Sequence, residues 1–276
     1  MARFFRRFLI LTVIVFLALN IMAYLHARSM LYFSSSNTPR VDAAQLSFTQ
    51  KVDVLFTGIT MSRPEANIKP SSLGHHCTRI RIPNGPASFL GTWYCPNTQQ
   101  DRLVILFHGY AMDKSSQLNV ARFFIASEYS VLLVDFRGSW ESSESYTTIG
   151  YDEADDVATT INYARQNLAH QKIVLYGQSM GAAAILRAVH SLDIHADALI
   201  LELVFDDLVN TVKNRFSMMN LPAFPAAHLL VLWGSVQTDF NGFTHNPVTY
   251  AKTVDIPTLF LHGDADTRAR LSEALR

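Results

Sequence analysis

The chain has little charge and no excess of either sign, because its 276 residues include 23 Lys and Arg and 23 Asp and Glu. A neutral balance argues against nucleic acid as a partner, since phosphate backbones attract cationic surfaces. The sequence also lacks internal repeats and long low-complexity tracts, which speaks against solenoid and disordered architectures. Its 49% hydrophobic content suits one globular domain and an additional apolar segment.

Cysteine is scarce, with only Cys77 and Cys95. They lie nine residues on either side of Pro86, so a hairpin that turns there brings them opposite each other, with Cβ atoms about 4.5 to 5.5 Å apart. We therefore expect a disulfide formed in an oxidising compartment, with two buried free thiols as the alternative. His75 and His76 precede Cys77, but no second group has metal-ligand spacing, so we expect no metal and no other cofactor.

A long apolar segment lies near the start of the sequence. Phe8 to Leu25 contains Asn20 as its only strongly polar residue, and this is the length needed to cross a hydrocarbon core of about 30 Å. Three arginines precede the segment, and only Arg28 and Arg40 follow it closely. The positive-inside bias therefore predicts a single-pass protein with a cytoplasmic N-terminus and an extracytoplasmic remainder.

Residues 1–28 are accordingly predicted to be a transmembrane signal anchor. A cleaved signal peptide is the rival interpretation, although Leu25-His26-Ala27 is a poor cleavage site and the apolar run exceeds a typical signal core. Residues 29–75 are predicted to be a stalk with an amphipathic helix. Its apolar stripe can lie on the membrane surface or against the following domain, and packing on the domain is the simpler expectation. The stripe comprises Phe48, Val52, Leu55, Phe56 and Ile59.

The most informative motif is Gly177-Gln178-Ser179-Met180-Gly181. The apolar run 172–176 precedes it and the alanine-rich run 182–189 follows it, which predicts a strand, a sharp turn and a helix. This is the pattern of a nucleophile elbow, with Ser179 at the apex. Glycine is needed at 177 and 181 because a Cβ there would collide with the neighbouring strand or helix. The pattern therefore indicates a nucleophilic serine that a substrate carbonyl can reach.

Two further apolar runs each lead into a motif that begins with His-Gly. Residues 103–107 lead into His108-Gly109-Tyr110, and residues 258–261 lead into His262-Gly263-Asp264-Ala265-Asp266. With the elbow, these motifs resemble the α/β-hydrolase family, including its membrane-anchored bacterial esterase-like and serine aminopeptidase-like members, from about residue 76 onward. The resemblance implies a mostly parallel twisted sheet with helices on both faces and a small helical cap at about residues 203–252.

The resemblance also implies roles for particular residues. The backbone amides of Tyr110 and Met180 would form the oxyanion hole, and Asp266, rather than Asp264, would be the triad acid. His108 and His262 would make structural hydrogen bonds instead of acting as the base. Asp135-Phe136-Arg137-Gly138 is similar to the family's Asp-x-Arg-Gly turn, in which the two charged residues brace loops.

One departure from the family pattern concerns the base. The family's catalytic histidine follows one more strand after the acid, whereas this sequence has ten residues after Asp266 and no histidine beyond His262. We therefore expect the hydrolase domain, residues 76–276, to be C-terminally truncated and to lack its last strand. The predicted activity is hydrolysis of esters, thioesters or amides of small acyl substrates through Ser179, impaired by the absent histidine. The alternatives are a peptidase acting on N-terminal residues and a non-catalytic relative or remnant with a binding role.

Overall fold

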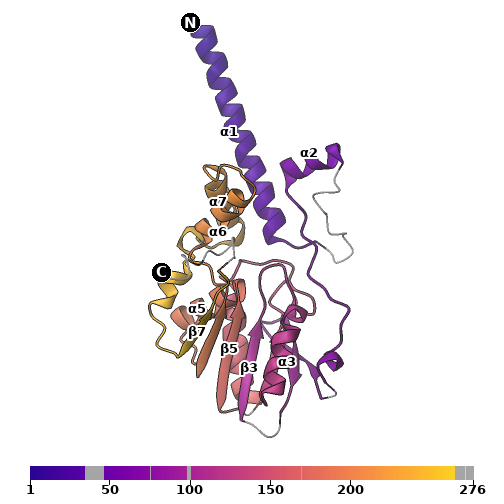
Figure 1. Ribbon diagram of the computed structural model, residues 1–276. Helices are drawn as coiled ribbons and strands as arrows, with labels where there is room; N and C mark the ends of the chain where they lie inside the picture. The colour runs from indigo at the N-terminus through magenta and orange to yellow at the C-terminus, as the bar shows by residue number, and fades with distance from the viewer. Residues whose placement is uncertain (35–46, 75, 98–100, 169, 265–270, 272–276) are drawn as a thin grey trace.

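The computed structural model describes residues 1–34, 47–74, 76–97, 101–168, 170–264 and Leu271, and Figure 1 shows their arrangement. A long N-terminal helix extends from one end of an α/β domain, and two cap helices lie beside the part of that helix nearest the domain.

The N-terminal helix α1 spans Ala2–Leu31. It is long and apolar enough to cross a membrane by length and composition, a property that anchors share with signal sequences. Every residue before Asn20 is exposed, whereas Ala23, Ala27 and Leu31 are buried at a spacing of one helical turn. The last part of α1 is therefore packed against the rest of the chain.

A seven-stranded sheet forms the centre of the domain, in the order β1-β2-β4-β3-β5-β6-β7. The strands β3 to β7 pair in parallel, and β1 and β2 pair antiparallel at one edge. Along the central strand β3, alternate residues enter two separate cores, as with Ile105 and Leu106. The strands are β1 (Thr78–Pro83), β2 (Phe89–Cys95), β3 (Arg102–Phe107), β4 (Ser130–Val134), β5 (Lys172–Gln178), β6 (Ala198–Glu202) and β7 (Thr258–Leu261).

Helices cover both faces of the sheet. α4 and α5 pack over one core, and α3 packs over the other. The predicted mostly parallel sheet with helices on both faces, the α/β-hydrolase fold, is thereby confirmed. The remaining helices are α2 (Phe48–Thr57), α3 (Leu118–Ala126), α4 (Glu153–Asn167), α5 (Met180–Leu192), α6 (Leu208–Met218), α7 (Ala226–Thr238) and α8 (Pro247–Ala251), with short 3-10 helices at Pro70–Leu73, Lys114–Gln117 and Gly242–Thr244.

The strand β7 forms one edge of the sheet within the described residues. Leu259, Phe260 and Leu261 are exposed along it. An apolar, exposed edge strand offers unpaired backbone groups to another strand.

The hairpin of β1 and β2 carries both cysteines. Its register pairs Thr78 with Tyr94, which places Cys77 and Cys95 opposite each other with their Cα atoms 4.1 Å apart. The structure joins their sulfur atoms in a disulfide.

The first residues of the segment between α1 and the sheet are hydrogen-bonded to other parts of the chain. Tyr32 bridges to Tyr146, and Ser34 bridges to Ser62, so the residues directly after α1 are hydrogen-bonded into the domain. The helix α2 lies beside α1 (Figure 1), instead of on the hydrolase domain as the simpler expectation had it. The contact is close, because a Cβ on Gly58 would lie 2.3 Å from the Ser29 Oγ. The side chains of Val52 and Leu55 lie outside the described residues.

Candidate active site

The proposed nucleophile, Ser179, lies between the end of β5 and the start of α5. Its backbone is in a left-handed, strained region at φ 53° and ψ −108°. A Cβ on Gly177 would lie 2.6 Å from the Ala182 N, and a Cβ on Gly181 would lie 2.5 Å from the Phe107 O. Both glycines are therefore required by close backbone contacts, one with α5 and one with the end of β3. This geometry is that of a nucleophile elbow.

The loop after β3 passes directly beside the elbow. A Cβ on Gly109 would lie 3.7 Å from the Ser179 Cβ, so the loop and the serine are neighbours. Within the described part of the chain, the backbone N–H groups of Tyr110 and Met180 have no acceptor. Met180 is the first residue of α5, where a helix leaves its N–H groups without an internal partner. The two amides that the sequence analysis singled out thus have no hydrogen-bond acceptor among the described residues.

The side chain of Tyr110 ties the same loop to α1. Its hydroxyl donates a 2.6 Å hydrogen bond to the Met30 carbonyl oxygen. The ring packs against Phe33, and the Arg215 guanidinium lies 5.2 Å from the ring centroid. Burial raises the pKa of Tyr110 to about 12, so the hydroxyl remains a hydrogen-bond donor at neutral pH.

His108 is fully buried, and both of its ring nitrogens hydrogen-bond to backbone groups. Its Nε2 accepts a 3.1 Å hydrogen bond from the Phe136 N–H, so the ring proton resides on Nδ1, which donates to the Gly109 carbonyl oxygen at 2.8 Å. Burial lowers the pKa of this imidazole and keeps it neutral. Both nitrogens hold the loop in place, which matches the structural role expected for His108.

A second buried histidine, His245, is also committed to structural bonds. Its Nε2 is 3.1 Å from the Ile149 carbonyl oxygen, and its Nδ1 is 3.2 Å from the Tyr250 hydroxyl. Burial lowers the pKa of His245 to about 4. Ser179 itself hydrogen-bonds only through its backbone to the residues that the structure describes. The expected acid, Asp266, lies outside the described residues.

Glu202 is a carboxyl group near the elbow that the sequence analysis did not select. It ends β6 opposite Gln178, and its carbonyl oxygen accepts a 2.8 Å hydrogen bond from the Ser179 N–H. Its carboxylate accepts a hydrogen bond from the Tyr176 hydroxyl, and burial raises its pKa. The available signal was a glutamate at the carboxyl end of the strand next to the nucleophile strand, where ligands bind in open α/β sheets.

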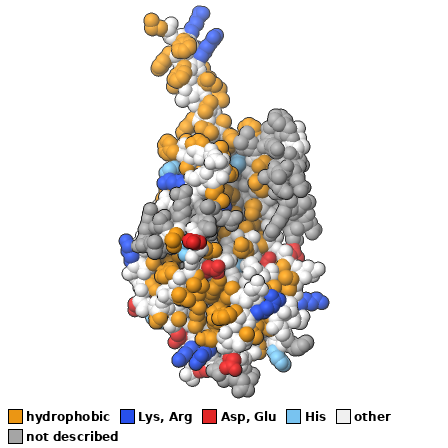
Figure 2. Space-filling view, in the orientation of Figure 1, with side chains coloured by type: hydrophobic (Ala, Val, Ile, Leu, Met, Phe, Trp, Pro, Cys, Tyr) orange, Lys and Arg blue, Asp and Glu red, His pale blue; other side chains and the backbone are white. Residues whose placement is uncertain are grey.

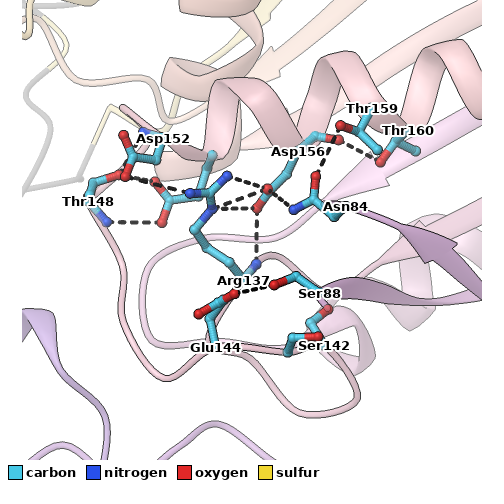
Figure 3. Close-up of polar contacts among 12 residues, drawn as sticks. Asn84, Ser88, Arg137, Ser142, Glu144, Thr148, Asp152, Asp156, Thr159 and Thr160 are labelled. Atoms are coloured by element: carbon cyan, nitrogen blue, oxygen red, sulfur yellow. Dashed lines mark hydrogen bonds and ion pairs between the residues drawn. The ribbon is translucent and has the colours of Figure 1, made fainter. Parts of the chain in front are cut away.

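Figure 3 shows the bracing role of Arg137. Its guanidinium bonds the buried carboxylate of Asp156 at 2.7 Å and lies 3.5 Å from Asp152. Burial disfavours the charge on Arg137, but the adjacent Asp156 outweighs burial and raises the pKa of Arg137. Asn84 donates to the same carboxylate at 2.8 Å, which joins the β1–β2 turn to α4.

Asp135 holds the loops that contain Lys114 and Glu141 through an ion pair and hydrogen bonds. It pairs with the fully buried ammonium group of Lys114 and accepts a 3.0 Å hydrogen bond from the Glu141 N–H. Arg137 and Asp135 therefore brace the loops around the site, as expected from the turn that contains them.

The helices α6 and α7 lie inside residues 203–252, the segment that the sequence analysis expected to form a cap. An apolar pocket lies between these helices and the last turns of α1. Ile149 lines this pocket and also packs against Ala183, in the first turn after the nucleophile elbow. Ile149 thus connects the pocket to the helical turn that follows Ser179.

Comparisons with known proteins agree with this geometry. Residues 98–204 match the family described as "Serine aminopeptidase, S33". The chain is 24% identical to the Bacillus subtilis protein YqkD over 188 residues, which are 66% of this chain and 59% of YqkD. It is 26% identical to protein bem46 of Schizosaccharomyces pombe over 166 residues, 59% of this chain and 50% of bem46. The chain therefore spans about half the length of the curated relatives it matches.

Among solved structures, the Pyrococcus furiosus esterase Pf2001 is similar with a TM-score of 0.65 and 22% identity, over 77% of this chain and 80% of that esterase. This similarity shows a shared fold. Together with the sheet and the strained turn at Ser179, it shows that the chain has the α/β-hydrolase fold.

Proposed function

We propose that the chain is a serine hydrolase that cleaves ester, thioester or amide bonds of acyl substrates through an acyl-enzyme on Ser179. The observation that carries this proposal is the strained serine at the elbow beside two N–H groups, those of Tyr110 and Met180, without acceptors in the described chain. Two such donors stabilise the oxyanion that develops when a hydroxyl attacks a carbonyl.

In this mechanism the Ser179 Oγ bonds to the acyl carbon and gives up its proton. The bond to the leaving group breaks, and the leaving group takes that proton. Water then hydrolyses the acyl-enzyme and releases the acid. Asp266 is proposed to orient the histidine that moves the proton. Because no described histidine bonds the Ser179 hydroxyl, we expect acylation of the 276-residue chain to be slow.

A fluorophosphonate probe tests the proposal. We expect slow labelling of the purified full chain that disappears in Ser179→Ala and persists in Ser127→Ala, a control at an exposed serine on the end of α3. Labelling that survives Ser179→Ala would remove Ser179 as the nucleophile. No labelling at any exposure would favour the alternative of a non-catalytic acyl-binding relative.

The family model also raises peptidase activity as a second candidate, since its description names a serine aminopeptidase. Hydrolysis of an amino-acid anilide that exceeds hydrolysis of a matched ester would favour the peptidase. The reverse order would favour the esterase.

We also propose that α1 anchors the chain in a membrane, with the N-terminus in the cytoplasm and the hydrolase domain outside it. Figure 2 shows hydrophobic side chains along α1 and basic side chains at its N-terminal tip, which supports this orientation. The Cys77–Cys95 disulfide is consistent with an oxidising compartment.

Packing at the end of α1 favours an anchor over a cleaved signal peptide. The Asn20 side-chain oxygen accepts a hydrogen bond from Trp233 and the Tyr24 carbonyl oxygen accepts one from Gln237, so cleavage near residue 27 would remove both bonds and the buried Ala23. A reporter fused after Arg276 that is active only in the cytoplasm would contradict the proposed orientation. A mature protein lacking residues 1–27 would contradict the anchor.

A further inference from the structure

The cap carries a large apolar surface. No Asp, Glu, Lys or Arg occurs between Phe216 and Thr238. The helix α7 has apolar residues on all sides, yet only Ala227 and Val231 are buried in it. Helices that are apolar all round are normally buried in a core or in a membrane. The large exposed apolar residues at the end of α6, in the loop 219–225 and on α7 are Met218, Met219, Leu221, Phe224, Leu232 and Val236.

This surface is continuous with the apolar part of α1. The Trp233 Nε1–H donates a 3.1 Å hydrogen bond to the Asn20 Oδ1, and the Trp233 ring packs edge-on against Tyr24 at 5.6 Å. The apolar run of α1 ends at Leu25, so these contacts lie within its last six residues, about 7 Å along the helix axis. Apolar faces of interfacial helices enter a bilayer by about 5–10 Å.

The residues at this contact are also those typical of a membrane boundary. Trp and Tyr are enriched at the level of the lipid headgroups, and Trp233 and Tyr24 meet there. Arg28 follows one turn later on α1 with an exposed side chain. If α1 spans the bilayer, the contacts of Trp233 with Asn20 and Tyr24 place the cap at its surface.

The apolar pocket lies beside the next turns of α1, which follow its contact with Trp233. It is lined by residues of α1, α6 and α7 that include Ala27, Leu31, Val212, Leu230 and Val231. Met30 also lines the pocket, and its carbonyl oxygen holds the Tyr110 hydroxyl. The pocket therefore lies between the apolar surface of the cap and the loop that carries the proposed oxyanion amide.

We propose that the substrate is an acyl ester of a membrane lipid, which reaches Ser179 from the bilayer along the cap. This proposal rests on the proposed serine hydrolase and on the proposed anchor. The loop 219–225 and the outer side of α7 lie in the headgroup and upper acyl region. The acyl chain packs along their apolar side chains, and only its end enters the pocket, which has a cavity volume of about 40 Å³. Ser179 bonds to the acyl carbon, the ester C–O bond breaks, and the lipid alkoxide takes the serine proton. Water then releases the fatty acid from Ser179.

Fluorescence quenching tests the position of the cap. The chain has no free cysteine in its native form, so a single introduced cysteine carries the fluorophore. The full Ser179→Ala chain is reconstituted in phosphatidylcholine vesicles with acyl chains brominated near the headgroup, which separates the result from catalysis. We expect quenching of a probe at Phe224→Cys at least threefold stronger than at Phe123→Cys. Phe123 is a matched exposed phenylalanine on α3, with 64% exposure against 75% for Phe224.

A third probe separates failure of the cap from failure of the anchor. A probe at Val13→Cys lies within the apolar run of α1 and reports the anchor. Quenching at Val13→Cys without quenching at Phe224→Cys would overturn the proposed cap position. Absence of quenching at both positions would overturn the anchor, and the lipid route with it.

Photo-cross-linking tests the pocket. A phosphatidylcholine with a diazirine in its acyl chain is expected to label the region 205–242 in the Ser179→Ala chain. Gly234 lines the pocket, so Gly234→Leu fills it and should reduce this labelling at least fivefold. Gly234→Ala adds only a methyl at an ordinary 3.5 Å contact with Leu31 and should leave labelling unchanged.

Equal labelling of the Ser179→Ala chain with and without Gly234→Leu would overturn the proposed acyl site. Labelling by an S-palmitoyl peptide carrying the same diazirine, without labelling by the phospholipid, would also overturn it and would identify lipidated protein as the ligand. Neither result depends on hydrolysis, so the fluorophosphonate experiment remains an independent test of Ser179.

Discussion

The hydroxyl of Tyr110 donates a 2.6 Å hydrogen bond to the carbonyl oxygen of Met30, which connects the loop after β3 to the last turn of α1. These residues are 80 positions apart in the sequence. The bond satisfies a carbonyl that the helix end cannot pair internally, and it fixes the loop that passes beside Ser179. The N-terminal helix is therefore part of the structure that shapes the candidate active site.

This bond leads to a first prediction. Tyr110→Phe should lower the free energy of unfolding by about 1 kcal/mol, because the Met30 carbonyl loses its buried partner. It should also slow fluorophosphonate labelling of Ser179, since the loop becomes less firmly held. Denaturant unfolding and labelling of the full chain in detergent measure both effects. Tyr24→Phe is the matched control, and an equal loss in that variant would contradict the role of the Tyr110 hydroxyl.

The elbow glycines lead to a second prediction. Gly181→Ala places a Cβ 2.5 Å from the Phe107 O and 2.9 Å from the His108 O, and both are backbone atoms that cannot move aside independently. We expect destabilisation of several kcal/mol, or loss of the folded protein, as for overpacked sites with strained backbone. Gly263→Ala has nothing within 4 Å and should unfold like the parent chain. Thermal unfolding of the parent chain, Gly181→Ala and Gly263→Ala tests this prediction. A Gly181→Ala protein as stable as the parent chain would refute the elbow geometry.

A third prediction concerns pH. Because burial lowers the folded-state pKa of His245 to about 4, the unfolded chain, with a pKa near 6.5, binds this proton first. His245 therefore contributes stability above about pH 6.5 that is lost as the pH falls toward 4, on the order of a few kcal/mol. His245→Phe should have a lower free energy of unfolding than the parent chain at pH 7, because Ile149 and Tyr250 lose a hydrogen-bond partner. Between pH 6.5 and 4, however, the variant should lose less stability than the parent chain does.

The measurement is the pH dependence of the unfolding free energy for the parent chain and the variant. His195→Phe, which replaces a histidine with an 81% exposed side chain, is the control for the substitution itself. A slope in His245→Phe identical to that of the parent between pH 6.5 and 4 would count against buried, neutral His245.

The disulfide leads to a fourth prediction. Cys77 and Cys95 are 18 positions apart, and closing a loop of this size stabilises a folded chain by about 3 kcal/mol in the chain-entropy model. The double variant Cys77→Ser, Cys95→Ser should be destabilised by about that amount and should be indifferent to dithiothreitol, whereas the parent chain is sensitive. Protein isolated from its native compartment should resist alkylation without reductant. Free alkylation of both thiols would contradict the bond.

Local sequence patterns were sufficient for much of the fold. The run 172–176, the two glycines around Ser179 and the alanine-rich run after it specify strand, turn and helix from neighbouring residues alone. The apolar run of α1 and the apolar runs that form β3 and β7 follow from composition and periodicity in the same way. The expected structural role of His108 also matches, because a residue directly after a buried strand enters the core beside that strand.

Other features depend on residues that are distant in sequence. Asn20 meets Trp233 across 213 positions, and Arg63 reaches the carbonyl oxygen of Glu144 across 81 positions. The expected packing of α2 on the domain differs from its position beside α1, because an amphipathic stripe does not specify its partner. Glu202 was not selected because one glutamate at a strand end carries no spacing signal.

The sequence by itself determined the elements and the strained turn at Ser179, since helix period, strand alternation and the glycines of a tight turn act over a few residues. Only the tertiary structure decided that the last turns of α1, the helices α6 and α7 and the loop after β3 form one unit. That arrangement depends on hydrogen bonds and apolar packing between segments whose separation in the chain leaves no pattern to read.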